Sequence, residues 1–331
     1  MIIIIVSSSK FFSMRKFLLV LGVVLLVLVV ISLFGGDQKT ERKEINRLSS
    51  IPVDVVKSTP EEDMYSPILY SDEFLTPVPV KAISSAGAED SPFIPADRDE
   101  LYFFFTPDVR IPVEKQVSDG VTGIYVSQRG SDGEWQEPER VWLQRPGKLS
   151  LDGCEFVSGD SMLFCAAREG FTGLHWFSAK RQADDTWGDW QLADFLPEYE
   201  VGELHIFGDE LYYHSTRAGG QGENDIWRLT FKEGEWRDPE NVAVVNSSSN
   251  DGWPYVSPDG SELWFLRNYL GTPAIFRSQR GSDGEWQEPE MIVSQFAGEP
   301  TLDRDGNLYF VHHYYRNGVM LEADIYIAKR K

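Results

Sequence analysis

After about residue 50 the chain shows no long helical periodicity, and its apolar residues fall into short strand-like segments. One such segment, a leucine followed by an aromatic residue, recurs at intervals of 45 to 62 residues. The leucines that open these segments are Leu101, Leu163, Leu211, Leu263 and Leu308. A period of this size is typical of a repeat architecture, in which neighbouring units stack because one unit alone cannot bury its apolar faces.

Each repeat carries a second strand-like segment and then a turn with a tryptophan. Two of these turns share the thirteen residues SQRGSDGEWQEPE, at residues 127–139 and 278–290. Asp-Gly supplies the positive φ of a tight turn, and the proline that follows suits an outermost strand, where no N–H is needed. With the strand that precedes each leucine segment, this pattern predicts four antiparallel strands per repeat, the fourth at the edge.

Two stretches carry a family resemblance. Residues 251–265, with the turn Ser-Pro-Asp-Gly at residues 257–260, resemble the PD40 (WD40-like, TolB-like) β-propeller repeat. Residues 215–227 resemble the longer form of that repeat, in which a Gly-Gly loop precedes Asp-Ile-aromatic. The resemblance covers residues 74–331 and implies an all-β propeller. It implies no particular function, because such propellers serve many roles.

The two ends of the repeat region complement each other. The last repeat ends at Lys331 without a fourth strand, while residues 72–80 imitate the turn and edge strand at residues 132–141. We therefore predict that residues 74–84 pair with Ile325, Tyr326 and Ile327 as the outer strand of the last repeat. Four complete repeats and one shared repeat give a five-bladed β-propeller over residues 74–331, closed without an open edge.

The N-terminus has a different composition. Residues 1–16 are basic, with Met14 as a second candidate start, and residues 17–34 are uncharged and apolar. This length predicts a transmembrane signal anchor, with a cleaved signal peptide as the alternative. Residues 35–73 are predicted to form a stalk that carries the propeller outside the cytoplasm, in the periplasm or at the cell surface. Basic residues flank the apolar stretch on both sides, so the positive-inside count alone does not decide its orientation.

The formal net charge is −21. This charge favours solubility, and it argues against nucleic acid as a partner and against a propeller lying flat on anionic lipid, since both would repel it. The two cysteines, Cys154 and Cys165, are predicted to face each other across a tight turn. They form either a cross-strand disulfide or a pair of free buried thiols.

Candidate chemistry gathers where each first strand begins. The acids there are Glu89, Asp90, Asp152, Glu203, Asp251 and Glu299, and the arginines that leave the second strands are Arg168, Arg217 and Arg267. A ring of acids at one opening would bind a cationic ligand or a hard cation such as Ca²⁺ through its carboxylate oxygens. In the alternative interpretation each acid caps its own turn or pairs with an arginine. No other cofactor is expected.

The same face is predicted to receive the longest loops, at residues 107–121, 218–224 and 314–321. Variable loops on a rigid scaffold are the usual place for binding. We therefore expect a binding module for a protein, glycan or other ligand rather than an enzyme. The alternative is a carbohydrate hydrolase that uses Asp90, Asp152 and Asp251. No Gly-x-Ser-x-Gly elbow or phosphate-binding loop is present.

Overall fold

The computed structural model describes residues 46–116, 119–145 and 147–331. Within these ranges no helix is long and apolar enough to cross a membrane. The predicted anchor at residues 17–34, the basic residues 1–16 and the first part of the predicted stalk lie outside the described residues. The described residues belong to one compact unit, Ile45–Lys331.

The described chain is built of β-strands, with three short 3-10 turns: η1 (Leu48–Ser50), η2 (Val113–Lys115) and η3 (Pro197–Tyr199). The first strands of the successive repeats are β3 (Ala88–Phe93), β7 (Ser150–Ser158), β11 (Leu204–Phe207), β15 (Asp251–Val256) and β19 (Ala297–Leu302). The second strands are β4 (Glu100–Thr106), β8 (Ser161–Arg168), β12 (Glu210–Ser215), β16 (Glu262–Tyr269) and β20 (Leu308–Arg316). The third strands are β5 (Gly123–Gln128), β9 (His175–Arg181), β13 (Asp225–Lys232), β17 (Thr272–Gln279) and β21 (Val319–Ala328). The outer strands are β6 (Glu139–Arg140), β10 (Trp187–Leu192), β14 (Glu235–Asn241), β18 (Glu290–Ser294) and β2 (Val78–Pro79).

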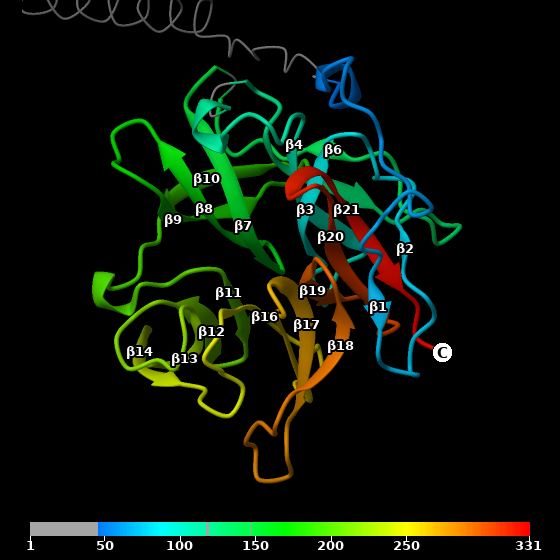
Figure 1. Cartoon of the computed structure of the whole chain (residues 1–331). Helices are drawn as coiled ribbons and strands as arrows, with labels where there is room; N and C mark the ends of the chain where they lie inside the picture. The colour runs from blue at the N-terminus through cyan, green and yellow to red at the C-terminus, as the bar shows by residue number, and fades with distance from the viewer. Residues whose placement is uncertain (1–45, 117–118, 146) are drawn as a thin grey trace, which may run out of the picture. The chain divides into compact units, whose positions relative to one another are not determined.

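These strands form antiparallel meanders in chain order. Two sheets have four strands, β7 to β10 and β11 to β14, and a third carries β15 to β18 with β1 (Ile68–Leu69) at its edge. The remaining sheet has eight strands because one parallel pair, Ala88 with Ala323, joins β3 to β21. The first strands contact one another in a cycle, β3 to β7, β11, β15, β19 and back to β3. This cyclic arrangement is that of an all-β propeller (Figure 1).

The predicted pairing of the two ends of the repeat region is confirmed. In β2, Val78 pairs with Ile327 and Pro79 with Tyr326, and the Val80 amide donates to the Ile325 carbonyl. Figure 1 shows β2 and the C-terminal strand β21 side by side. Phe74 forms a bridge with Arg330, as Trp135 does with Arg129 and Trp286 with Arg280. The segment before β3 therefore completes the sheet of the last strands of the chain.

The part of the expected stalk that is described, residues 46–73, packs along the sheets. Arg47 is buried and forms an ion pair with Glu89. The Lys57 ammonium lies between the carboxylates of Glu322 and Asp324, 2.5 Å from each. Asp63 accepts a hydrogen bond from a ring nitrogen of His312 at 2.9 Å, and β1 pairs with β18. We call residues 46–73 the N-terminal strap.

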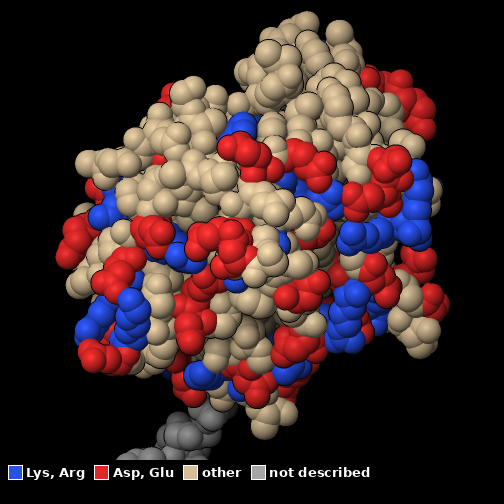
Figure 2. Space-filling model, turned by 90° about the horizontal axis from the view of Figure 1, so that it is seen from below, with Lys and Arg blue, Asp and Glu red and all other residues tan. Residues whose placement is uncertain are grey.

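The surface charge is mixed in sign. Lys and Arg side chains lie beside Asp and Glu side chains over the face seen in Figure 2, although acids outnumber bases in the whole chain, 52 to 31. Exposed acids and bases of the described chain also form ion pairs, such as Lys232 with Asp238 and Arg237 with Glu235. The excess negative charge is therefore spread over the face rather than collected in one patch.

Candidate functional site

The first strands share a backbone irregularity that places side chains at the centre of the molecule. In β3, β7, β15 and β19 a β-bulge shifts the register with the second strand, because two residues of the first strand lie opposite one residue of the second. The first bulge residue is left-handed in each case: Ser91 (φ 50°), Cys154 (φ 54°), Trp253 (φ 51°) and Glu299 (φ 53°). Bulges re-aim side chains and are common beside functional sites. A left-handed non-glycine residue stores about 1 kcal/mol or more of strain, which the surrounding structure must offset.

The register in β11 gives the equivalent position of the remaining repeat. His205 faces Tyr212 as Phe93 faces Tyr102, so Glu203 corresponds to Ser91. These five residues, and those that follow them in the first strands, line one cavity of about 50 Å³. We call it the central cavity, and the equivalent residues the ring: Ser91, Cys154, Glu203, Trp253 and Glu299.

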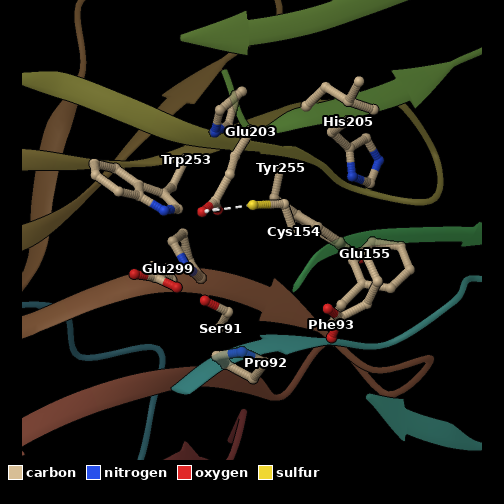
Figure 3. A pocket seen from close by; sticks show the side chains of 13 residues that line it. Ser91, Pro92, Phe93, Cys154, Glu155, Glu203, His205, Trp253, Tyr255 and Glu299 are labelled. Carbon is tan, nitrogen blue, oxygen red and sulfur yellow. Dashed lines mark hydrogen bonds between the residues drawn. The ribbon is translucent and has the colours of Figure 1, made fainter. Parts of the chain in front are cut away.

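The ring carries two carboxyl groups that have no lysine or arginine partner among the described residues, Glu203 and Glu299. Figure 3 shows Ser91 and Glu299 on one side of the cavity, across from Cys154 and Glu203. The Cys154 thiol lies 3.6 Å from Glu203 Oε1, and the indole nitrogen of Trp253 faces the same carboxyl. Both carboxyl groups thus line the same small cavity.

Burial raises the pKa of both carboxyl groups well above the ordinary glutamate value. For Glu203 the neighbouring Cys154 adds to the effect of burial. For Glu299 the negative charges of Asp90 and Glu203 add to it. A charged carboxylate is disfavoured where water is excluded and like charges lie close, which is the physical cause of both raised pKa values.

Asp90 and His313 form a charged pair beside the ring. His313 Nε2 lies 3.5 Å from Asp90 Oδ2. Burial alone would raise the pKa of Asp90, but the His313 imidazolium outweighs it, and the pKa lies below the ordinary value. Burial likewise lowers the pKa of His313, and the charge of Asp90 outweighs it in turn, so that the pKa is raised. His313 thus pairs with Asp90, and its charge also acts on Glu299, where it opposes the rise in pKa.

Glu155, the second bulge residue of β7, is a further carboxyl of the central cavity. Its side chain is buried, and neither oxygen has a hydrogen-bond partner in another described residue. Burial raises its pKa to about 8. A buried polar group without a partner is costly, which is why such groups are rare and point to a site that is completed by something else.

The other predicted acids lie in ion pairs away from the cavity lining. Asp152 Oδ1 is 2.5 Å from Arg168 Nη1, and Asp251 Oδ1 is 2.5 Å from Arg267 Nε. Glu89 accepts hydrogen bonds from Arg47 and from the Ser85 amide and hydroxyl. These three acids have the roles of the alternative interpretation, in which each acid caps its own turn or pairs with an arginine.

Arg217 has a different environment from the other two predicted arginines. Its guanidinium lies over the Trp227 ring, 4.7 Å from the centroid, and Nη1 donates to the Tyr213 hydroxyl at 3.3 Å. It therefore stabilises the third meander by cation–π contact rather than by an acid of the predicted ring.

Sequence reasoning missed three members of the ring, Ser91, Cys154 and Trp253. They differ in chemistry, so no shared residue type marks the position. The available signal was positional, because Glu203 and Glu299 sit nearer their strands than Glu89, Asp152 and Asp251 do. This offset separates the ring position from the position of the acids that form ion pairs. Among the described residues no group of three or more His, Cys, Asp or Glu side chains is arranged to hold a metal ion.

The cysteine pair also departs from the expected register. The tight turn pairs Val157 with Met162 as predicted, but the bulge shifts the next pairs, so Cys165 faces Gly153 instead of Cys154. Both thiols are free. A hydrogen bond with the Cys165 side chain, together with burial, raises the pKa of the Cys154 thiol.

No family model matches the chain, and no curated protein matches it. Among solved structures it is similar to a TolB-like protein from Agrobacterium tumefaciens, with 15% identity over 73% of this chain and 78% of that chain, TM-score 0.41. It is also similar to the catalytic domain of a GH62 α-L-arabinofuranosidase from Coprinopsis cinerea (7%, 74% and 91%, TM-score 0.45). An endo-arabinase from Bacteroides thetaiotaomicron gives 13% identity, 77% and 96% coverage and a TM-score of 0.44. Similarities this distant do not bear on the function of the chain.

Proposed function

We propose that this chain is a five-bladed β-propeller that acts as a binding module, and that its central cavity receives a cationic group of a protein or small-molecule ligand. The observation that carries the proposal is that Glu203 and Glu299 line one cavity without a lysine or arginine partner among the described residues. The unpartnered carboxyl of Glu155, buried in the same cavity, supports it independently. The cycle of contacts among the five first strands supports this blade count.

The electrostatics of the cavity suit a cation better than an anion or a neutral group. An ammonium or guanidinium group would supply the missing counter-charge and lower the raised pKa values of Glu203 and Glu299. Binding near neutral pH would then release protons, and affinity would rise with pH. The cavity volume of about 50 Å³ admits only the compact head of a ligand, so the remainder must lie outside it.

The chain itself contains a related arrangement. The Lys57 ammonium of the N-terminal strap lies between Glu322 and Asp324 and 5.3 Å from the centroid of the Tyr314 ring. Two acids and one aromatic ring thus hold an ammonium group on this scaffold. Glu203, Glu299 and Trp253 repeat that combination of side chains in the central cavity, with no cation supplied by the described chain.

Calorimetric titration with methylammonium and with arginine methyl ester tests the proposal. We expect binding to the wild type at pH 8 and a loss of about tenfold or more in affinity for E203Q and for E299Q, because each removes one of two charges that contact a desolvated cation. Glu288→Gln, at an exposed acid, is the matched control and should bind as the wild type does. Equal affinity in all four proteins, or no binding by the wild type, would contradict the proposal.

Proton release gives a second readout. Titrations at one pH in two buffers of different ionisation enthalpy should differ in apparent heat if Glu203 or Glu299 loses a proton on binding. The difference should shrink in the E203Q and E299Q variants. Heats that are independent of buffer would argue that these carboxyl groups do not titrate with the ligand.

A carbohydrate hydrolase is the second candidate function. Two carboxyl groups with raised pKa in one cavity are also what a general acid requires. Asp152 and Asp251 lie in buried ion pairs and do not line the cavity, so Glu203 and Glu299 would be the acids of such an enzyme. Incubation with a panel of oligosaccharides decides: turnover by the wild type that E203Q or E299Q abolishes supports an enzyme, and no turnover excludes this reading for the panel.

We also propose that residues 17–34 anchor the chain in a membrane with the propeller outside the cytoplasm. The length and apolar character of that stretch support the proposal. Membrane fractionation of the full chain, followed by protease treatment of intact cells, tests it. Recovery of the full chain in the soluble fraction, or protection of the propeller until the cells are broken, would contradict it.

A further inference from the structure

Neighbouring sheets are joined by a recurring contact that we call the arginine clamp. The residue that follows or ends the third strand is an arginine stacked on the aromatic residue it bridges: Arg129 on Trp135, Arg181 on Trp187, Arg280 on Trp286 and Arg330 on Phe74. Each guanidinium also lies near an acid of a neighbouring repeat. In the same order, the acids are Asp303, Glu100, Glu210 and, at 3.9 Å, Glu262.

The interface between the β7–β10 sheet and the β11–β14 sheet is built differently. Phe231 occupies the arginine position there and pairs with Trp236. On the neighbouring sheet, Leu163 stands where Tyr102, Tyr212, Trp264 and Tyr309 stand in the other repeats. Charged and aromatic partners have been replaced on both sides, so this interface has no clamp among the described residues. We call it the open seam.

A cavity of about 450 Å³ lies between the same two sheets, lined by residues around Cys154, Cys165 and Glu203 rather than by the residues at the clamp position. Its walls are mainly apolar, with Leu174, Trp176, Phe195, Leu196 and Val201 among the lining residues. Leu174 and Leu196 are also strongly exposed, at 61% and 52%. A mostly apolar cavity of this size with a few polar groups is typical of a site for a small organic ligand. We call it the seam cavity.

The seam cavity meets the central cavity at two shared residues, Cys154 and Glu203. Cys165 lines only the seam cavity, and Glu299 lines only the central cavity. A ligand with its charged head near Glu203 would therefore place its body in the seam cavity. Asp194, which accepts a hydrogen bond from His175, and Glu200 add negative charge to the lining. The lining is thus suited to a cationic rather than an anionic ligand.

We propose that the seam cavity binds the apolar, aromatic or aliphatic body of an amphipathic amine whose ammonium group reaches Glu203. This proposal rests on the proposed function and names the ligand class. The small central cavity accepts the head, and the larger seam cavity accepts what the central cavity has no room for. Burial of apolar surface adds affinity that a bare ammonium ion cannot gain.

Calorimetry with three probes, methylamine, tryptamine and the neutral analogue tryptophol, tests the proposal on the full chain. We expect tryptamine to bind at least tenfold more tightly than methylamine, and tryptophol to bind at least tenfold more weakly than tryptamine. Leu174→Ala and Leu196→Ala should weaken tryptamine threefold or more and leave methylamine unchanged. Leu270→Ala is the matched control, because Leu270 is an exposed leucine (88%) that does not line the seam cavity.

A labelling experiment locates the ligand and does not depend on affinity ratios. In a C154S variant, Cys165 is the remaining thiol. Saturating tryptamine should slow the modification of Cys165 by methyl methanethiosulfonate, and methylamine at saturation should not. Near-UV circular dichroism of each variant shows that the fold is retained.

The outcomes separate the two proposals. If methylamine and tryptamine bind equally and both depend on Glu203, the proposed function stands and the seam proposal is overturned. If tryptophol binds as tightly as tryptamine, the ammonium contact is overturned. If neither methylamine nor tryptamine binds, both proposals are overturned. Both are also overturned if tryptamine binds equally well to the wild type and to E203Q and does not protect Cys165.

Discussion

At the scale of single residues, one backbone position serves different chemistry in each repeat. Ser91, Cys154, Trp253 and Glu299 share a left-handed conformation that only glycine adopts without strain, yet none of them is glycine. In each of these repeats the bulge places this residue in the lining of the central cavity. The strained backbone positions therefore coincide with the site on which the proposed function depends.

The clearest prediction at this scale concerns Glu155. Its folded-state pKa of about 8 lies above the ordinary value of 4.5, so the folded chain holds a proton that the unfolded chain has lost between these pH values. Stability therefore falls as pH rises from about 4.5 to 8. We expect Glu155→Gln to be more stable than the wild type at pH 8 by about 1–3 kcal/mol, with a flatter pH profile.

Urea unfolding at pH 5 and at pH 8 measures both quantities. Glu288→Gln, at an exposed acid, is the control and should follow the wild type at both pH values. A wild type whose stability does not fall between pH 5 and pH 8 would show that Glu155 has a partner in solution, such as bound water or a ligand.

At the scale of elements, the arginine clamps hold the sheets against one another. In the best buried clamp, Arg181 stacks on Trp187, donates to the Tyr102 hydroxyl and pairs with Glu100, with both charged side chains about 95% buried. Removing one partner of a buried pair leaves the other charge without compensation. The clamps thus explain why acids, arginines and aromatic residues recur together along the repeats.

We expect Arg181→Ala to lower the free energy of unfolding by about 2–4 kcal/mol, because Glu100 loses its cation in a buried position. Arg237→Ala removes an exposed pair with Glu235 and should change the free energy of unfolding far less, because solvent screens that pair. Urea unfolding of the two variants compares them directly. A loss of the same size in both variants would mean that the clamp contributes no more than a surface ion pair.

At the scale of the whole molecule, the segment before β3 joins the beginning of the repeat region to its end. Phe74 is almost fully buried, with its ring edge-on to Trp264 at 6.1 Å, and the Leu75 amide donates to the Lys329 carbonyl. Glu73 adds ion pairs to Arg277 and Arg330. Side chains and backbone therefore both hold this segment on the last strands.

We expect Phe74→Ala to lower the unfolding free energy by about 3–5 kcal/mol, since it removes a large buried ring. The adjacent exposed Leu75→Ala should change it by about 0.5 kcal/mol or less. Hydrogen exchange should report faster exchange at the amide of Val80, which donates to Ile325, in the Phe74 variant. Unchanged exchange there, despite lower stability, would mean that ring closure does not depend on Phe74.

Much of the fold could be predicted because it depends on local patterns of apolar residues and turn residues. Each leucine segment from Leu101 to Leu308 lies in a second strand, and the likeness of residues 72–80 to residues 132–141 predicted the pairing of Val78 with Ile327. The N-terminal strap could not be predicted in this way. Arg47 and Glu89 are 42 residues apart and carry no pattern that marks them as a pair.

The candidate site shows the same division. Sequence reasoning placed acids near the centre and left open whether they bind or form ion pairs. The structure puts Asp152 and Asp251 with Arg168 and Arg267, and Glu203 and Glu299 in the cavity. The position along the first strand decides which acids reach the centre, since Glu203 and Glu299 occupy the ring position and Asp152 and Asp251 stand two residues before it.

The sequence by itself determined the repeat and the strands of each repeat, because these depend on turn chemistry and apolar spacing within some fifty residues. The pairing of the two ends could also be predicted, because the segment before the first repeat imitates the edge strand that the last repeat lacks. Only the tertiary structure decided which side chains meet in the central cavity and that one interface between sheets lacks an arginine clamp. Those features depend on bulges and on contacts between distant repeats. There the conformation of one residue is set by neighbours from other parts of the chain.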